Sequence, residues 1–255
     1  MVFPLSMLVL LAAAVLVSSI GFKNYVWFIS LGYGFSIAAE GLAMLLLFRG
    51  SLSAGTVLCC LLFIVYGCCL GGYLAYRELK SASYKRNMTG EIKDGSTISM
   101  GAKCANWLSC ACLHNGVGTS VTSYIGAAIM VCGLALESAA DLQKNAAKKK
   151  NPRRFVDTGL YRLVRCPNYL GEMLFWTGVV VSGIGALQGV GQRVLALIGY
   201  AGIIFVMFSG ARRLEIRQNK NYGNDPEYQQ YVKTVPILLP FVPLYSVEKY
   251  KRLVA

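Results

Sequence analysis

Apolar residues occur along this chain in long continuous blocks, not in stripes that repeat every three or four positions. A helix needs about 20 mostly apolar residues to cross the hydrocarbon core of a bilayer, and blocks of about that length recur throughout the sequence. The pattern predicts an all-α, polytopic membrane protein built as a bundle of seven transmembrane helices. The predicted spans cover residues 3–20, 25–48, 54–76, 99–115, 119–140, 168–188 and 193–211.

Composition favours a membrane protein over a soluble one. Hydrophobic residues make up 55% of the 255 residues and charged residues only 15%, and the mean hydropathy is +0.51. A soluble domain usually carries about 25% charged residues. The first apolar block has no basic region before it, and Lys23 follows it. A second apolar block comes at once, so we expect an uncleaved helix and not a signal peptide.

The basic residues predict the orientation in the membrane, because cytoplasmic loops collect Lys and Arg. With seven spans and a cytoplasmic C-terminus, 23 of the 25 basic residues fall on the cytoplasmic side, and only Arg49 and Arg193 fall outside. This topology accounts for most of the net charge of +13, so no nucleic-acid partner is expected. Short loops favour a bacterial inner membrane, with the endoplasmic reticulum as the alternative, and the oligomeric state is left open.

The nine cysteines do not predict a disulfide framework. Those inside apolar blocks behave as small hydrophobic residues. Three others and the single histidine match no zinc-ligand spacing, so we expect no metal site. The first group contains Cys59, Cys60, Cys68, Cys69 and Cys132, and the second contains Cys104, Cys110, Cys112 and His114.

Glu40 lies in the middle of the second predicted span. A charge in hydrocarbon is costly, so an intramembrane acid is a functional candidate. Such a carboxyl group is expected to hold its proton and to donate a hydrogen bond; the alternative is a group that pairs with a neighbouring helix. Tyr73 and Arg77 end the third span four residues apart and share a helix face. Tyr73 and Arg77 are candidates for a functional pair. The alternative is that Tyr73 is an aromatic residue at the membrane interface and Arg77 extends its charged end toward water.

Acidic and basic residues recur at helical spacing where the fifth span ends. Glu137, Asp141, Lys144 and Lys148 share one face, with Arg154 soon after. They predict a polar wall of a cleft at the mouth of the bundle. The alternative, a solvated helix end with its cluster of cations, explains the lysines but not Glu137, which lies one turn deeper.

The sixth span begins with a polar face. Pro167 suits the first turn of a helix, and Asn168 and Glu172 then share a face beside Arg162 and Arg165. Residues 212–231 add further arginines and tyrosines, and arginine clusters suit phosphate groups. That segment contains no G-x-G-x-x-G or P-loop motif. A nucleotide would therefore be held inside the cytoplasmic half of the bundle.

Three motifs lie within residues 133–243. The first is Glu137-x-x-x-Asp141-x-Gln143-Lys144. The second is Gly159-Leu160-Tyr161-Arg162 followed by Arg165-Cys166-Pro167-Asn168-Tyr169-Leu170-Gly171-Glu172. The third is Arg213-x-Glu215 with Tyr222-Gly223, Tyr231, Val235-Pro236 and Pro240. By these motifs the chain resembles the membrane-embedded steroid and sterol reductases: steroid 5α-reductases, sterol Δ14-reductases and their bacterial relatives. Many relatives have His in place of Cys166, and the 5α-reductase branch typically has Asn in place of Glu137.

The resemblance implies a seven-helix bundle that binds NADPH from the cytoplasmic side. Within one transmembrane domain of residues 1–255, it implies that residues 1–116 shape the substrate pocket and residues 117–255 bind the cofactor. It also implies that Glu40 and Tyr73 polarise a substrate carbonyl, with Tyr76 as the alternative to Tyr73. The implied cofactor-binding residues are Glu137, Asp141, Lys148, Arg154, Arg165, Asn168, Tyr169, Glu172, Arg213, Arg217, Tyr222 and Tyr231.

The expected activity is NADPH-dependent reduction of a carbon–carbon double bond conjugated to a ketone, in a steroid-like or sterol-like lipid of the 3-oxo-Δ4 type. Two alternatives stay open. One is an S-adenosylmethionine-dependent methyltransferase of the isoprenylcysteine or phospholipid type, whose C-terminal pattern is similar. The other is a non-catalytic lipid-binding membrane protein. The Glu137–Lys144 motif and the Asn168–Glu172 string favour the reductase.

Overall fold

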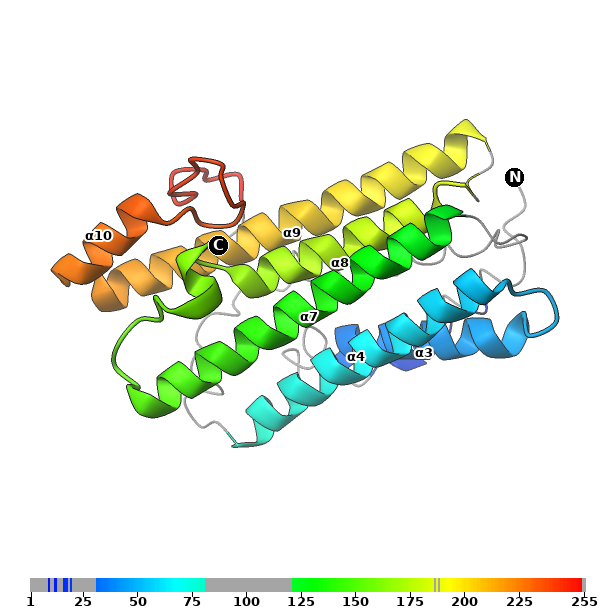
Figure 1. The fold of residues 1–255 in the computed structure, drawn as a ribbon, viewed down its shortest axis with the longest axis horizontal. Coiled ribbons are helices and arrows are strands. Elements are labelled where there is room, and N and C mark those ends of the chain that lie inside the picture. Colours follow the sequence, from blue (N-terminus) through cyan, green and yellow to red (C-terminus); the bar gives the residue numbers. More distant parts are fainter. Residues whose placement is uncertain are drawn as a thin grey trace. The chain divides into compact units, whose positions relative to one another are not determined.

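The computed structural model describes residues 31–80, 121–185, 187 and 189–253, with five isolated positions among the first nineteen; of residues 77–80 it describes the backbone alone. Within these residues the regular structure is entirely helical, in agreement with the predicted all-α class. The predicted span 99–115 and nearly all of 3–20 lie outside the described residues. Figure 1 shows α3 (Tyr33–Leu47), α4 (Ala54–Lys80), α7 (Val121–Lys150), η3 (Gly159–Arg162), α8 (Pro167–Gly183), α9 (Val190–Tyr222) and α10 (Pro226–Thr234).

Three of the described helices are long and apolar enough to cross a membrane. They cover Ala54–Tyr76, Val121–Lys150 and Val190–Tyr222, at the places of three predicted spans. The apolar α3 is shorter, with 15 residues, and α8 has 17 residues and begins at Pro167 as predicted. These helices are those of a membrane protein.

The helices α7 and α9 extend beyond the predicted spans, which end at residues 140 and 211. The structure continues them as helix to Lys150 and Tyr222. The added turns are rich in Ala, Lys, Arg and Gln, which favour helix, and no Gly or Pro interrupts them before Pro152 and Gly223. Each charged segment therefore continues a membrane helix as a polar one.

The chain divides into two compact units. Unit 1 contains Met1–Ala128 and Thr177–Gly202, and unit 2 contains Ile129–Trp176 and Ile203–Ala255. The helices α7, α8 and α9 each contribute residues to both units.

In unit 1, α3 and α4 form an antiparallel hairpin whose backbones touch (Figure 1). Glycine permits this contact, because a Cβ atom at Gly34 would lie 2.7 Å from the nitrogen of Gly71. A Cβ atom at Gly67 would lie 2.4 Å from the oxygen of Gly34. Small residues at helix contacts let apolar helices approach closely where lipid offers no hydrophobic driving force.

In unit 2, α7 packs on α8 through glycine in the same way. A Cβ atom at Gly133 would lie 2.4 Å from the nitrogen of Phe175, and one at Gly171 would lie 2.6 Å from the nitrogen of Glu137. On α9, a Cβ atom at Gly210 would lie 3.2 Å from the ring of Tyr169 on α8. These contacts fix where Glu137 lies on the α7–α8 boundary.

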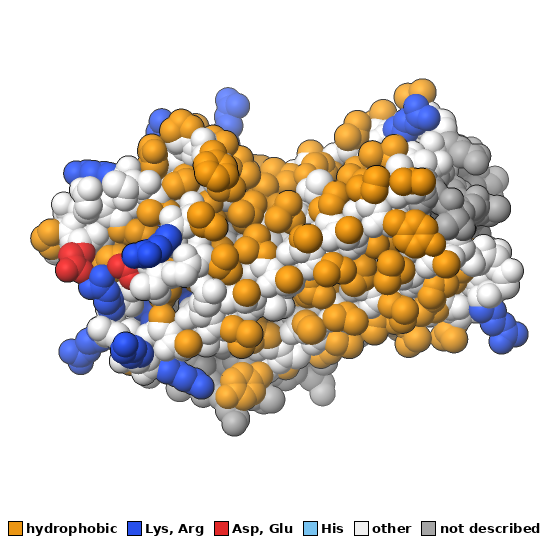
Figure 2. Space-filling view, viewed as in Figure 1, with side chains coloured by type: hydrophobic (Ala, Val, Ile, Leu, Met, Phe, Trp, Pro, Cys, Tyr) orange, Lys and Arg blue, Asp and Glu red, His pale blue; other side chains and the backbone are white. Residues whose placement is uncertain are grey.

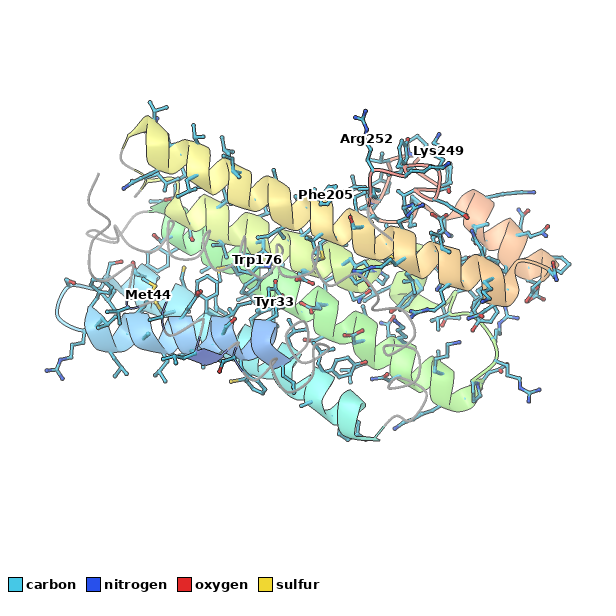
Figure 3. The ribbon with its side chains drawn as sticks, turned by 180° about the vertical axis from the view of Figure 1, so that it is seen from behind. Tyr33, Met44, Trp176, Phe205, Lys249 and Arg252 are labelled. Carbon is cyan, nitrogen blue, oxygen red and sulfur yellow. The ribbon has the colours of Figure 1, made fainter. Side chains whose placement is uncertain are left out.

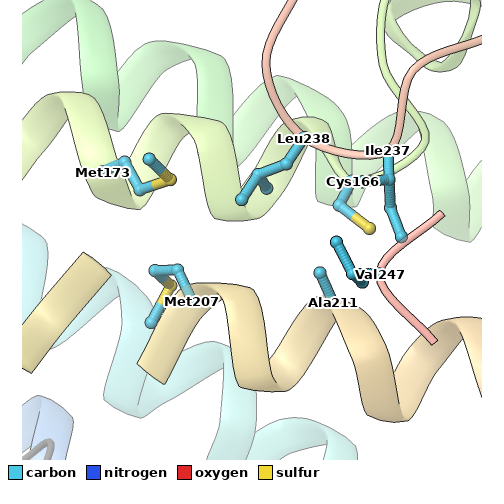
Figure 4. Close-up of a cluster of buried hydrophobic side chains, with 7 residues drawn as sticks. All are labelled: Cys166, Met173, Met207, Ala211, Ile237, Leu238 and Val247. Atoms are coloured by element: carbon cyan, nitrogen blue, oxygen red, sulfur yellow. The ribbon is translucent and has the colours of Figure 1, made fainter. Parts of the chain in front are cut away.

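The residues after α10 return to the helices of unit 2 and form part of its core. The backbone N–H groups of Arg165 and Cys166 donate to the oxygens of Pro236 and Ile237, at 2.9 and 3.0 Å. Figure 4 shows the buried cluster that results, which joins the start of α8, the middle of α9 and the C-terminal residues. Its members are Cys166, Met173, Met207, Ala211, Ile237, Leu238 and Val247.

Figure 2 shows apolar side chains spread over the helices, and many of the Lys and Arg side chains beyond them, toward the end of α7 and around α10. Large apolar side chains are exposed on the helices of unit 2, including Val131 (49%), Leu142 (70%) and Phe205 (40%). The last turn of α7 carries Lys148, Lys149 and Lys150. Exposed apolar side chains along a helix that ends in cations are typical of a helix that crosses lipid and ends at its surface.

Candidate functional site

Three acidic side chains surround the contact between α7 and α8 in unit 2. Glu137 on α7 and Glu172 on α8 are both buried, each with 8% of its surface exposed. Glu137 interacts electrostatically with Glu172 and with Asp141, one turn further along α7. Glu137 and Asp141 therefore share one face of α7, as their helical spacing predicts, and Glu137 lies against α8.

One oxygen atom of this acidic group has no hydrogen-bond partner. Oε2 of Glu137 is buried and accepts no hydrogen bond from the described part of the chain. An unsatisfied buried polar atom costs about 1–3 kcal/mol, so a donor from a bound molecule would be stabilising here. Among the described residues, no group of three or more His, Cys, Asp or Glu is arranged to hold a metal ion.

Where α7 ends, four aromatic rings form a cluster that we call the aromatic clasp: Phe155, Tyr222, Tyr228 and Tyr231. The ring centroid of Phe155 lies 5.3 Å from those of Tyr228 and Tyr231 and 6.0 Å from that of Tyr222. Lys148 donates from Nζ to the Tyr222 hydroxyl at 2.9 Å, and also to the backbone oxygen before Phe155 at 2.6 Å. Lys148 thereby ties the loop after α7 to α9.

Arg154 is engaged by two carboxylates. Its guanidinium group donates to Glu227 on α10, and to Asp157 in its own loop at 2.9 Å. These contacts, that with Glu227 first, raise the pKa of Arg154 above its ordinary value. The Arg154 side chain is 41% exposed, so solvent weakens both pairs. The resemblance assigns Arg154 to the cofactor, whereas the structure shows it joining the loop to α10.

The second motif forms a fixed corner between α7 and α10. Gly159 has a φ of 62°, in the left-handed region that favours glycine, and Oε1 of Gln143 lies 2.3 Å from where its Cβ would be. That oxygen accepts the N–H of Leu160 at 2.9 Å. Tyr161 donates to a backbone oxygen of α7 at 3.3 Å, and Tyr231 donates to the backbone oxygen of Tyr161 at 2.8 Å. The motif positions the start of α8.

Arg165 and Glu215 form a buried ion pair at 2.9 Å, with 1% and 4% of their side chains exposed. The other oxygen of Glu215 accepts the N–H groups of Val247 and Glu248, at 2.9 and 3.0 Å. Arg165 also donates to the backbone oxygen of Tyr245. The pair thus joins the second motif, α9 and the C-terminal residues. The resemblance assigns Arg165 to the cofactor, and here the side chain also has this internal role.

The start of α8 faces α9. Asn168 and Tyr169 lie in the first turn of α8 and are half-buried, and the Tyr169 ring contacts the backbone of α9 at Gly210. Arg213 and Arg217, one turn apart on α9, are half-buried too. The amide of Asn168 and the cations Arg213 and Arg217 therefore lie toward the polar ends of α8 and α9.

The predicted cofactor-binding residues accordingly fall into two groups within unit 2. Those of the first group hold the loop, α9, α10 and the C-terminal residues together, and those of the second lie along α7, α8 and α9. The first group is Lys148, Arg154, Arg165, Tyr222 and Tyr231. The second group is Glu137, Asp141, Asn168, Tyr169, Glu172, Arg213 and Arg217.

The predicted catalytic pair lies in unit 1. Glu40 on α3 is 2% exposed, and Tyr73 on α4 is half-buried, whereas the alternative Tyr76 is 58% exposed. From the Gly34–Gly71 contact, Glu40 lies six residues along α3, and Tyr73 lies two residues beyond Gly71 on α4. Their backbones are therefore roughly 12 Å apart along the helix axes.

Side-chain direction reduces that separation. Side chains of a helix lean toward its N-terminus, and in the antiparallel α3–α4 hairpin this tilts Glu40 and Tyr73 toward each other. Tyr66 on α4, which is 0% exposed, lies nearer to the level of Glu40 than Tyr73 does.

Sequence reasoning assigned no role to Gln143, Glu215 and Tyr66. Gln143 and Glu215 both occur in the motifs quoted above. Glu215 is an acid in an otherwise basic stretch, which could have predicted that it pairs with a buried cation such as Arg165. Tyr66 lies within an apolar run, and no local feature of the sequence distinguishes it.

Fold and site together define an all-helical membrane protein with a polar site where α7, α8 and α9 leave their apolar segments. The family model described as "Protein of unknown function (DUF1295)" matches residues 104–235, slightly more than half of the chain. The chain therefore belongs to this family, which is part of the steroid 5α-reductase-like superfamily. No curated protein matches it, and no solved structure does.

Proposed function

We propose that this protein is an NADPH-dependent reductase that saturates a carbon–carbon double bond conjugated to a ketone in a steroid-like or sterol-like lipid. The observation that carries the proposal is the buried Glu137 oxygen without a partner, beside Glu172 and Asp141, in a chain of the steroid 5α-reductase-like superfamily. Such an oxygen suits a ligand that donates a hydrogen bond deep in the site, and Arg213 and Arg217 on α9 suit negative charge elsewhere on the same ligand.

The residues of unit 2 fit NADPH in that way. Its carboxamide and ribose hydroxyl groups are donors that carboxylates accept, and Glu137 is the acceptor left unsatisfied. Arg213 and Arg217, half-buried on α9, are the cations for its phosphates. NADPH supplies a hydride when bound. Lys148, Arg154 and Arg165 would act by holding the loop and α10 in place.

In unit 1, the proposal assigns carbonyl polarisation to Glu40 and Tyr73. Both donate a hydrogen bond to the ketone oxygen, which makes the β-carbon of the enone electrophilic. As a hydride adds to that carbon, the electron pair of the double bond moves onto the oxygen, where the two donors stabilise the enolate. A proton that reaches the α-carbon restores the ketone. The apolar helices give a lipid substrate access from the bilayer.

The proposed topology has seven spans with a cytoplasmic C-terminus in a bacterial inner membrane. It rests on the positive-inside distribution of Lys and Arg. A fluorescent protein fused to the C-terminus should fluoresce in bacterial cells, whereas alkaline phosphatase fused there should be inactive. The reverse result would overturn the orientation.

The test of the reductase is a thermal-shift measurement on detergent-purified protein with NADPH, NADH and S-adenosylmethionine in parallel. A ligand that binds only the folded state stabilises it by about 2.7 kcal/mol at 100 times its Kd. We expect NADPH to raise the melting temperature more than NADH, and S-adenosylmethionine to leave it unchanged. A shift with S-adenosylmethionine alone would favour the methyltransferase, and no shift with any ligand would favour the lipid-binding protein.

The variant Glu137→Leu links this test to the site. It removes an unsatisfied buried carboxylate, so the free protein should be more stable by about 1–3 kcal/mol, while the shift with NADPH should shrink. Glu137→Gln keeps an acceptor and should retain most of the shift. If the Leu variant binds NADPH as well as the wild type does, Glu137 does not contact the cofactor.

A further inference from the structure

Residues 235–253, which we call the C-terminal arm, have a buried base and an exposed tip. Ile237, Leu238 and Val247 at the base are at most 1% exposed. Phe241 at the tip is 97% exposed, and its neighbour Val242 is 44% exposed. Among the large apolar side chains of the described residues, Phe241 has the greatest exposure.

The tip is held in place and does not expose Phe241 through looseness. Ile237 donates its N–H to the oxygen of Leu244 at 2.9 Å, and Leu244 donates to the oxygen of Val242 at 2.7 Å. Phe241 itself has a φ of 64°, the single non-glycine residue with positive φ in the described part of the chain. That conformation is costly for a residue with a Cβ atom. The arm therefore keeps an aromatic ring outside its own core in a fixed and unfavourable backbone geometry.

The arm lies where α9 changes from apolar to charged. No charged residue occurs from Val194 to Ala211, and Arg212 ends that stretch. Arg212 donates from Nε to the backbone oxygen of Glu248 at 3.0 Å, and from Nη1 to that of Leu253 at 3.1 Å. Since α9 is long and apolar enough to cross a membrane, these two hydrogen bonds hold the arm beside the end of its apolar stretch.

The arm also carries exposed cations. Lys249, Lys251 and Arg252 are exposed on the arm, and Figure 3 shows Lys249 and Arg252 on it, with Phe205 on the adjoining α9. The single acid of the arm, Glu248, accepts a hydrogen bond from Asn219 at 2.7 Å. An arm that carries both an exposed aromatic residue and exposed cations matches the two layers of a bilayer surface, which are the acyl chains and the phosphate groups above them.

We propose that the C-terminal arm is a lipid-binding anchor. Phe241 and Val242 insert between lipids at the boundary of the hydrocarbon, and Lys249, Lys251 and Arg252 bind the phosphate groups of anionic lipids. The arm thus binds the membrane by a second contact besides the spanning helices, and it does so independently of the proposed reaction. A second copy of this chain is the rival occupant of the exposed tip.

Quenching of tryptophan fluorescence in vesicles tests the insertion. The variant Phe241→Trp is compared with wild-type protein, whose three tryptophans provide the background. Gln230→Trp, on an exposed position of α10, is the matched control. In phosphatidylcholine–phosphatidylglycerol vesicles, the fluorescence that Phe241→Trp adds should be quenched by brominated phosphatidylcholine, and at least threefold less by aqueous acrylamide than the signal of the control. Equal acrylamide quenching of the two variants would overturn the proposal.

Charge and occupancy are tested in the same system. Replacing Lys249, Lys251 and Arg252 together by Gln should lower lipid quenching at least twofold in vesicles with phosphatidylglycerol, and leave it unchanged in pure phosphatidylcholine. No difference between the two lipid compositions would overturn the binding of anionic headgroups. In detergent, acrylamide quenching of Phe241→Trp is also measured at several protein concentrations. Quenching that becomes weaker as the protein concentration rises would identify a second copy as the occupant and overturn the lipid anchor.

Discussion

Buried glutamates occur in four surroundings in the described part of the chain. Glu215 has a cation and two backbone donors, whereas one oxygen of Glu137 has no donor. Glu172 lies within electrostatic range of Glu137, and Glu40 is buried in unit 1. A satisfied acid supports structure, while an unsatisfied one supports a ligand-binding role, because only the latter loses free energy until a donor arrives.

Glu40→Gln and Tyr73→Phe should each lower kcat with little change in NADPH-induced stabilisation. Loss of one donor to a developing oxyanion typically costs about 10²–10³ in rate. The measurement is NADPH oxidation with an enone steroid, together with a thermal shift on each variant. Tyr66→Phe is the control: Tyr66 lies near the level of Glu40, but the proposal gives it no role in polarising the carbonyl, so kcat should stay within about twofold. A large loss with Tyr66→Phe and none with Tyr73→Phe would move the polarising role to Tyr66.

The titratable groups near the aromatic clasp predict a decline of stability in alkali. Burial raises the pKa of the Cys166 thiol and of the Tyr228 hydroxyl each to about 12, and it also raises that of Tyr231. In the unfolded chain these groups lose their protons at about pH 9 to 10. Above that pH the folded state binds more protons than the unfolded state, so unfolding becomes easier as pH rises.

Melting temperatures in detergent should therefore fall steadily from about pH 9 toward pH 12, after a plateau below pH 8. Tyr228→Phe removes one of the groups and should make the decline shallower. A flat profile up to pH 11 would contradict the burial of these groups.

At the scale of elements, glycine decides how the helices meet. Gly171→Ala places a Cβ atom 2.6 Å from the backbone nitrogen of Glu137, and a backbone atom of another helix cannot move aside. We expect a loss of about 2–4 kcal/mol, typical of overpacking at a tight contact, and a lower yield of monodisperse protein. Gly72→Ala on α4 meets nothing within 4 Å. It should be neutral or stabilising by about 0.5–1 kcal/mol, and equal melting temperatures of the two variants would contradict the contact.

The position of the helices could be predicted from local sequence, and their ends less well. Runs of apolar residues are visible directly, and Pro167 marks the start of α8 because proline favours the first turn. The ends of α7 and α9 lie beyond the apolar runs, at Asn151-Pro152 and Gly223. Hydropathy reports where a helix leaves lipid, whereas helix breakers report where the helix itself ends.

At the scale of the whole molecule, the ion pair of Arg165 and Glu215 connects three distant segments. Arg165→Ala or Glu215→Ala should each cost about 3–5 kcal/mol, because each leaves a buried charge without its partner. The double variant Arg165→Met with Glu215→Leu should recover most of the loss. Trypsin cleavage at Lys249 and Lys251 reports whether the arm stays docked. Rapid cleavage in the single variants is expected, and a rate equal to that of wild type would show that the arm is held by other contacts.

The sequence by itself determined the all-α class, the apolar segments, the start of α8 and the family to which the chain is similar, because these depend on residue type and on spacing within one element. Tertiary structure alone decided which of the predicted cofactor residues have internal partners. Lys148, Arg154, Arg165, Tyr222 and Tyr231 join segments far apart in the chain, and Glu137 keeps a buried oxygen without a partner. A motif states which groups are present, but whether a charge is satisfied depends on neighbours that only the folded chain brings within hydrogen-bond distance.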